Sequence, residues 1–156
     1  MNVFVFPGQG SQHLGMGADL YNSNRKAQQI FEDANEILGF KITDIMFGED
    51  QEALKQTNIT QPAIYIHSMV TALIANKFFK PDAVAGHSLG EFTALAAANY
   101  ISFEDGLRLV QKRALAMQEA CEKNESSMAA IVGLEDKIVE EVCLQSKETL
   151  VAANYN

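Results

Sequence analysis

A pentapeptide in the middle of the chain reads Gly86-His87-Ser88-Leu89-Gly90. A short apolar stretch, Ala83–Ala85, precedes it after a proline, and a segment rich in alanine and leucine follows it as far as Ala98. We therefore predict a strand, a sharp turn and a helix. This is the context in which a G-x-S-x-G motif exposes a serine at the end of a strand.

Ser88 is a candidate nucleophile because of this turn. Backbone at so sharp a turn is strained, and Gly86 and Gly90 lack the Cβ atoms that would collide there. The free N–H groups and the dipole at the start of the following helix favour a negatively charged oxygen beside the serine. The same pentapeptide also fits an ordinary tight turn, so other parts of the chain must distinguish the two interpretations.

The beginning of the chain predicts a second strand with a loop after it. Val3–Phe6 is an apolar run typical of a strand buried on both faces in a parallel sheet. The loop Pro7–Gln12 follows at the carboxyl end of that strand, where α/β sheets bind ligands. It lacks the Lys-Ser/Thr pair of a P-loop and the third glycine of a dinucleotide-binding loop, which argues against a nucleotide site. Gln9 either presents a donor towards the site or belongs to a plain surface turn.

Most of the chain between these strands and up to residue 123 is predicted to be helical. Gly39 is a candidate C-cap, and Thr60 is a candidate N-cap with Pro62 in the first turn. Ser102 and Asp105 resemble a capping box with aspartate in place of the usual glutamate. Residues 42–47 are expected to form a short apolar turn. The predicted helical segments are 16–21, 26–38, 50–55, 60–79, 89–98 and 102–123.

The helix that follows Ser102 carries an apolar stripe at helical spacing. Arg113 falls on the edge of this stripe, whereas Arg108 and Lys112 fall opposite it. An arginine beside a buried face needs a partner. Arg113 therefore either forms a structural salt bridge, extends its charged end to solvent, or clamps the carboxylate of a substrate. The stripe consists of Phe103, Leu107, Val110, Ala114, Met117 and Cys121.

Residues 122–127 are polar and mark a predicted boundary. Beyond it, residues 128–133 and 149–153 are strand-like and residues 135–144 are helical, a β-α-β order that predicts the opening of a small second subdomain. We therefore divide the chain into residues 1–124 and 125–156.

The composition indicates a globular protein with a proper core, since 47% of the 156 residues are apolar and 21% are charged. A net charge of −8 argues against a nucleic-acid partner. No apolar run approaches a membrane span, and the first residues carry no secretory signal. Cys121 and Cys143 have no metal-ligand spacing, which favours reduced thiols, a cytoplasmic location and no metal site.

Several separated motifs in the same order resemble the malonyl-CoA:acyl carrier protein transacylase family of bacterial fatty-acid synthesis, close kin of polyketide synthase acyltransferase domains. The matching segments are Phe4–Gln12, Thr60–Ala63, Gly86–Glu91, Gln111–Gln118 and Met128–Gly133. The resemblance implies a large α/β-hydrolase-like subdomain with a short parallel sheet, to which residues 1–124 would belong. It also implies a small ferredoxin-like subdomain, of which residues 125–156 would be the first part.

The resemblance also implies a role for each candidate residue. Ser88 would take the malonyl group from coenzyme A as an acyl-serine, and the backbone N–H groups of Leu89 and Gln9 would form the oxyanion hole. Arg113 would bind the free malonyl carboxylate. The phosphopantetheine thiol of acyl carrier protein would then attack the acyl-serine, with no cofactor other than the coenzyme A thioester that serves as substrate. A branched apolar residue such as Leu89 resembles the malonyl-selective members.

The histidines depart from the family pattern. The family activates its serine with a histidine further downstream, and the chain ends at Asn156 before any such residue. We therefore expect the N-terminal half of the enzyme, which needs its C-terminal half as a partner. His87, with the two glycines of the motif, is interpreted as an elbow residue rather than the base, and His67 as a packed core residue.

Two other functions remain open at this point. A serine hydrolase or thioesterase-like enzyme would use the same elbow and give its acyl group to water. A non-catalytic half that folds only with a partner chain would explain the absence of a base, and unpaired sheet edges predict that such a half associates or aggregates by itself.

Overall fold

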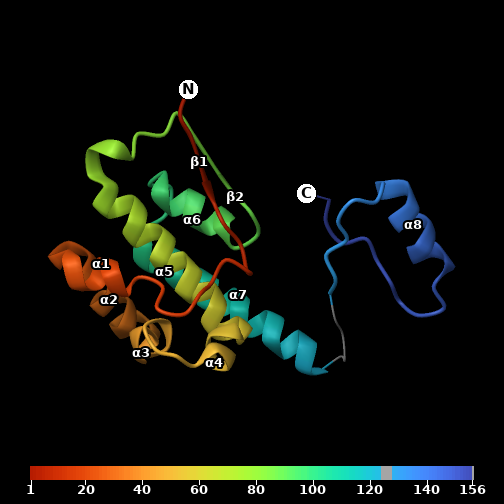
Figure 1. The fold of residues 1–156 in the computed structure, drawn as a ribbon, viewed down its shortest axis with the longest axis horizontal. Helices are drawn as coiled ribbons and strands as arrows, with labels where there is room; N and C mark the ends of the chain where they lie inside the picture. Colours follow the sequence, from red (N-terminus) through yellow and green to blue (C-terminus); the bar gives the residue numbers. More distant parts are fainter. Residues whose placement is uncertain (124–127, 156) are drawn as a thin grey trace. The chain divides into compact units, whose positions relative to one another are not determined.

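The computed structural model describes residues 1–123 and 128–155 (Figure 1). The chain divides into two compact units, Met1–Lys123 and Asn124–Asn156. The first unit contains a parallel pair of strands and a set of helices, and the second contains one helix among its described residues. The elements of the first unit are β1 (Val3–Phe6), α1 (Ala18–Ser23), α2 (Arg25–Leu38), α3 (Ile42–Met46), α4 (Gln51–Lys55), α5 (Thr57–Ala75), η1 (Asn76–Phe78), β2 (Ala83–Gly86), α6 (Gly90–Ala97) and α7 (Phe103–Lys123).

The two strands pair in parallel, with Val3 opposite Ala83 and Phe6 opposite Gly86. Helix α6 contacts both strands, as Figure 1 shows. Because the strands are parallel and in register, their carboxyl ends meet at one edge of the sheet. The loop after β1 and the turn after β2 are therefore brought together there, and the N–H of His87 donates to the carbonyl of Phe6 at 3.0 Å. The predicted α/β fold with a short parallel sheet is confirmed.

The prediction that β1 is buried on both faces is wrong. Phe6 is 7% exposed, whereas Val3 is 48% and Val5 is 74% exposed. Side chains alternate between the two faces of a strand, and the first unit covers one of these faces. Phe6 packs there against Ala72 of α5 and Ala94 of α6.

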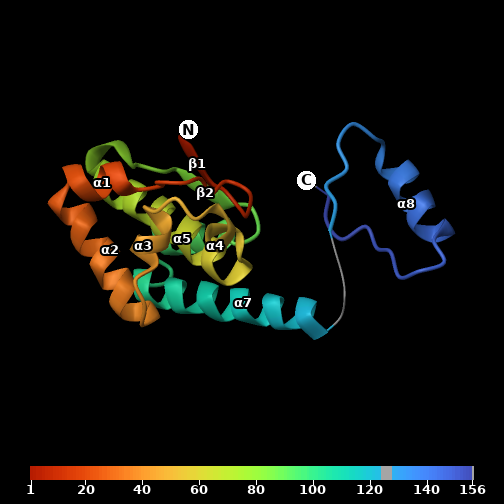
Figure 2. The same cartoon turned by 60° about the horizontal axis from the view of Figure 1, so that its bottom comes forward.

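Helices α5 and α7 form the centre of the helical layer, with α7 running along α5 (Figure 2). Helix α5 is buried on nearly all sides. The hydroxyl of Tyr65 in α5 donates to the carbonyl of Phe103 at 3.0 Å, and Gly106 of α7 lies against the same ring. A Cβ atom on Gly106 would collide with the Tyr65 hydroxyl, so glycine permits the close approach of the two helices.

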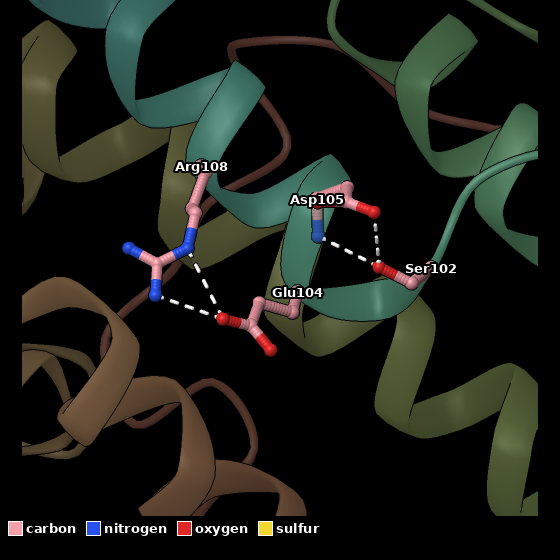
Figure 3. Close-up of polar contacts among 4 residues, drawn as sticks. All are labelled: Ser102, Glu104, Asp105 and Arg108. Carbon is pink, nitrogen blue, oxygen red and sulfur yellow. Dashed lines mark hydrogen bonds and ion pairs between the residues drawn. The ribbon is translucent and has the colours of Figure 1, made fainter.

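The predicted helix caps at Gly39 and Ser102 are confirmed. Gly39 follows α2 in a left-handed conformation, with φ 78°. At the start of α7, the N–H of Asp105 donates to Ser102 Oγ at 2.9 Å, and this hydroxyl donates to the Asp105 carboxylate at 2.7 Å (Figure 3). Ser102 therefore caps the helix as predicted, but Asp105 accepts from the Ser102 hydroxyl and not from the Ser102 backbone N–H that a capping box uses.

The predicted start of α5 is wrong by three residues. The helix begins at Thr57, so Pro62 lies inside it, and Thr60 donates its hydroxyl to the carbonyl of Leu54 in α4 instead of capping the helix. At its other end α5 stops at Ala75, because Asn76 turns to a positive φ of 47°, and η1 continues the segment.

Two shorter segments also differ from their predictions. Helix α1 begins two residues later than predicted, at Ala18, because Gly17 has a φ of 86°. Residues 42–46 form helix α3 rather than an irregular turn.

The described residues of the second unit, 128–155, contain α8 (Asp136–Gln145). Residues 128–133 and 149–153 form no strand, contrary to the prediction. A strand needs a neighbour to satisfy its backbone N–H and C=O groups, and among residues 128–155 neither segment has one. Within the described ranges, no helix combines the length and the apolar character needed to cross a membrane.

Candidate active site

Ser88 lies on a tight turn between β2 and α6 and has a positive φ of 56°. Such a conformation costs a non-glycine residue about 1–2 kcal/mol. Two hydrogen bonds fix the turn, from the N–H of Gly90 to the carbonyl of His87 at 2.9 Å and from the N–H of Glu91 to the carbonyl of Ser88 at 3.0 Å. The strand, turn and helix predicted around Ser88 are therefore present, and the serine side chain is half-buried.

The glycines of the motif allow backbone segments to touch. A Cβ atom on Gly86 would collide with the backbone of Gly90, and one on Gly90 would collide with the carbonyl of Phe6. In the loop after β1, a Cβ atom on Gly8 would lie 2.6 Å from His87 Nδ1 and 2.8 Å from the His87 carbonyl oxygen. Because real Cβ atoms do not approach so closely, the β1 loop reaches the elbow only with glycine at these positions.

Arg113, near the middle of α7, points its guanidinium at the elbow. Its Nη2 donates to Ser88 Oγ at 2.7 Å. Among the described residues, Arg113 forms no ion pair, whereas Arg108, five residues earlier, pairs with Glu104 at 2.8 Å (Figure 3). The structure thus answers the question that the sequence left open, since Arg113 makes neither a structural salt bridge nor a solvent-facing extension but a contact with the serine.

The amide of Gln61 in α5 completes this cluster, and sequence reasoning did not assign it a role. Its Oε1 accepts from Arg113 Nη1 at 2.6 Å, and its Nε2 lies 3.4 Å from Gln9 Oε1 and 3.3 Å from Met117 Sδ. The side chain is almost fully buried, with 1% exposed. A glutamine in a mostly apolar stretch of the helix is the signal that could have found it, because a buried amide needs polar partners.

The backbone N–H groups of Gln9 and Leu89 are among those at this edge of the sheet that have no acceptor among the residues that the structure describes. Leu89 is the N-cap residue of α6 and its side chain is fully buried. Gln9 is exposed, and its side-chain Nε2 lies 3.5 Å from Thr57 Oγ1. Donors without an intramolecular partner at the start of a helix are suited to bind an oxyanion.

The Acyl transferase domain family matches residues 3–156 of the chain. A curated relative from Staphylococcus aureus (strain MRSA252), "Malonyl CoA-acyl carrier protein transacylase", is 43% identical over 157 residues, which cover 99% of this chain and 51% of the relative. The chain belongs to the acyl transferase family.

Solved structures agree with this membership. The crystal structure of malonyl-CoA:acyl carrier protein transacylase from Helicobacter pylori matches this chain with a TM-score of 0.86 at 36% identity, over 93% of this chain and 48% of that one. A type II PKS acyl-carrier protein in complex with its malonyl-transacylase contains a chain that matches with a TM-score of 0.80 at 35% identity, over 92% of this chain and 47% of that one. The chain thus spans about half the length of the relatives it matches.

The histidines of the chain lie at two places in the first unit. The ring of His87, an exposed side chain, lies beside Gly8 in the β1 loop. His67 of α5 is half-buried, with its ring edge-on to that of His13 at 6.1 Å between centroids. Burial lowers the pKa of His67, and the nearby His13 lowers it further. Among the described residues, no three His, Cys, Asp or Glu side chains come close enough together to hold a metal ion.

Proposed function

We propose that this acyl transferase moves a malonyl group from coenzyme A to the phosphopantetheine thiol of acyl carrier protein in fatty-acid biosynthesis. The observation that carries the proposal is the 2.7 Å contact between Arg113 Nη2 and Ser88 Oγ, made by an arginine without an ion-pair partner among the described residues. A cation beside a nucleophile selects an acyl group that has its own negative charge. The names of the relatives, "Malonyl CoA-acyl carrier protein transacylase" among them, support the same substrate.

The transfer proceeds in two steps through an acyl-serine. Ser88 Oγ attacks the thioester carbonyl of malonyl-CoA, the C–S bond breaks, and coenzyme A leaves as its thiol. The carrier thiol then attacks the acyl-serine, the C–Oγ bond breaks, and Ser88 regains its proton. The N–H groups of Leu89 and Gln9 hold the oxyanion of each tetrahedral intermediate, and Arg113 holds the free carboxylate. The transfer uses no cofactor besides the thioester substrate.

The proton on Ser88 needs a general base, and we propose that the C-terminal half of the enzyme supplies it as a histidine. In the same proposal, the first unit belongs to an α/β-hydrolase-like subdomain, and residues 125–156 begin a ferredoxin-like subdomain whose strands form when neighbouring strands are present. The exposed Val3 and Val5 face of β1 supports a further layer over the sheet. Cys121 and Cys143, both free thiols, support a cytoplasmic location. The complex of a related malonyl-transacylase with its acyl-carrier protein supports the proposed acceptor.

The test is direct labelling of the full-length protein with malonyl-CoA, followed by mass spectrometry of the peptide that contains Ser88. We expect one malonyl group on Ser88 and its transfer to added acyl carrier protein. The Ser88→Ala variant is the control and gains no label. Release of the label to water, with none on the carrier protein, would identify a hydrolase, and absence of label on the wild-type protein would overturn the proposal.

The role of Arg113 is tested by Arg113→Ala in the same assay. The loss of a charge-assisted contact worth about 1.5–3 kcal/mol lowers malonyl loading roughly tenfold to hundredfold, while loading from acetyl-CoA, which lacks the carboxylate, is retained. The ratio of the two loading rates is the measurement. Unchanged malonyl selectivity in this variant would remove Arg113 from the site.

A further inference from the structure

Gln61 stands between the two parts of the site that the proposed transfer uses. It lies on α5, and its amide reaches Arg113 of α7 on one side and Gln9 of the β1 loop on the other, at 2.6 Å and 3.4 Å. Neither Ser88 nor the elbow contributes to these contacts. The amide is also sealed from solvent, with 1% of the residue exposed, so water does not replace a lost partner freely.

The orientation of this amide follows from the chemistry of arginine. A guanidinium carries only donors, so the atom that faces Arg113 Nη1 must be the acceptor, Oε1. The donor Nε2 is then directed at Gln9 Oε1 and at Met117 Sδ, 3.3 Å away. The side-chain carbonyl oxygen of Gln9, Oε1, therefore faces the amide of Gln61. The three side chains of Gln9, Gln61 and Arg113 form one continuous set of hydrogen bonds with a single consistent direction.

We propose that Gln61 is a positioning residue that holds the Arg113 guanidinium in the place where it binds the carboxylate of the acyl group; this inference rests on the proposed malonyl transfer. Arginine has a long side chain with many rotamers, and fixing one of them costs entropy. Gln61 anchors Nη1, which leaves Nη2 directed at Ser88 and the remaining N–H groups available to the substrate. The cation is therefore already in place before substrate binds.

An amide is the appropriate anchor because it is neutral. A glutamate at this position would also accept from Nη1, but its negative charge would offset the positive charge of Arg113, and the substrate carboxylate would meet a neutral pair. Gln61 accepts the hydrogen bond and leaves the charge of Arg113 uncompensated. Among the described residues no carboxylate pairs with Arg113, which agrees with this role.

The test compares Gln61→Leu and Gln61→Glu in the full-length protein. Leucine is similar in size and removes both hydrogen bonds, while glutamate keeps an acceptor and adds the charge. Loading of Ser88 is measured from malonyl-CoA and from acetyl-CoA at concentrations below saturation. Gln111→Leu is the matched control, because Gln111 is a half-buried glutamine of α7 that faces the carbonyl of Leu38 instead of the site.

We expect both variants of Gln61 to lower malonyl loading roughly tenfold to hundredfold, the range for a lost or offset hydrogen bond to a charged group. Acetyl loading stays near the wild-type level, and Gln111→Leu changes neither rate. On an Arg113→Ala background, Gln61→Leu has no further effect on malonyl loading. Equal losses for both acyl groups in both variants would show a purely structural role and overturn the proposal, as would unchanged malonyl loading in Gln61→Glu.

A second measurement separates this inference from the proposed function. The crystal structure of substrate-free Gln61→Leu is compared with that of the wild-type protein and of Gln111→Leu. We expect the Arg113 guanidinium to leave Ser88 or to spread over several rotamers in Gln61→Leu alone. An unmoved guanidinium overturns the positioning role. The two proposals can also fail separately. If the wild-type protein takes no malonyl group, but the position of the Arg113 guanidinium changes in Gln61→Leu, the proposed function is overturned and the anchoring contact is established.

Discussion

Ser88 has a backbone conformation that few serines adopt, and its neighbours hold it there. The positive φ of 56° is maintained by hydrogen bonds across the turn and by contacts of Gly86 and Gly90 with adjacent backbone. The energy of the strained residue is offset by the packing around it. The position of the hydroxyl is therefore a property of the whole turn, and a methyl group on either glycine displaces it.

The first prediction concerns Gly86→Ala. The new Cβ atom meets the backbone of Gly90, which has no side chain to rotate away, so we expect about 2–4 kcal/mol of lost stability and no malonyl label on Ser88. Gly39→Ala is the control, since Gly39 has a positive φ of 78° but no atom within 4 Å of its Cβ position. It loses about 1 kcal/mol. Urea unfolding measures both, and equal losses would contradict the collision.

The site residues differ in how far sequence could find them. Ser88 is marked by a motif with a strand before it and a helix after it, and Arg113 by its place at the edge of an apolar stripe. The hydrogen bond between them joins residues that are 25 positions apart, and neither local pattern predicts this tertiary contact. Gln61 is 52 residues from Arg113 in the sequence. Nothing in its local sequence indicates which residue its amide contacts, so only the three-dimensional structure identifies Arg113 as its partner.

At the scale of elements, the contact of α5 with α7 determines where Gln61 and Arg113 face each other. The helix caps at Gly39 and Ser102 were predictable because they depend on residues within one turn. The start of α5 was not, because Thr60 has a partner in α4, the carbonyl of Leu54, that outcompetes its role as a cap. Likewise, the exposure of Val5 depends on what covers the sheet, which a four-residue apolar run does not reveal.

A second prediction tests the α5–α7 contact. Gly106→Ala places a methyl group against the Tyr65 hydroxyl, and we expect about 1–3 kcal/mol of lost stability from overpacking. Tyr65→Phe removes that hydroxyl and its hydrogen bond to the Phe103 carbonyl, at a cost of about 1 kcal/mol. The double variant is more stable than the sum of the single effects predicts, because removing the hydroxyl relieves the closest contact, although ring carbon Cζ still lies 2.8 Å from the new Cβ position. Strict additivity in thermal unfolding would refute this account.

A third prediction concerns pH and His67 in α5. Burial, and then the neighbouring His13, lower the pKa of His67 below its ordinary value of 6.5, while Asp19 acts in the opposite direction. The unfolded chain therefore binds the proton more readily than the folded protein, so this contribution to stability is complete above about pH 6.5 and is lost as the pH falls. We expect His67→Gln to lose less unfolding free energy than wild type between about pH 7.5 and pH 5.5. Identical pH profiles would contradict it.

At the scale of the whole molecule, the first unit brings a serine and an arginine into contact, and its sheet has one covered face. The open face of β1 contains Val3 and Val5, while Val84 of β2 packs on the covered side. An apolar sheet face in water favours association with other apolar surfaces. The covered face packs against the helices of the unit, and the open face is an apolar surface available for association.

The fourth prediction is that the 156-residue chain by itself associates through this open face. Val5→Thr keeps a branched residue that suits a strand but adds a hydroxyl, and we expect it to reduce association in sedimentation velocity experiments. Val84→Thr is the matched control on the covered face, where it lowers stability without reducing association. The prediction is wrong if the wild-type chain is monomeric at every concentration, or if the wild-type, Val5→Thr and Val84→Thr chains associate equally.

The short distance between Ser88 Oγ and Arg113 Nη2 has a consequence for inhibitor design. A compound that joins an electrophilic warhead to an acidic tail would form a covalent bond with the alcohol and an ionic contact with the guanidinium at the same time. Serine hydrolases do not need such a cation beside their nucleophile, so the acidic tail would contribute nothing to their inhibition. If the proposed transfer holds, selectivity over that large class of off-targets therefore depends on one anionic group.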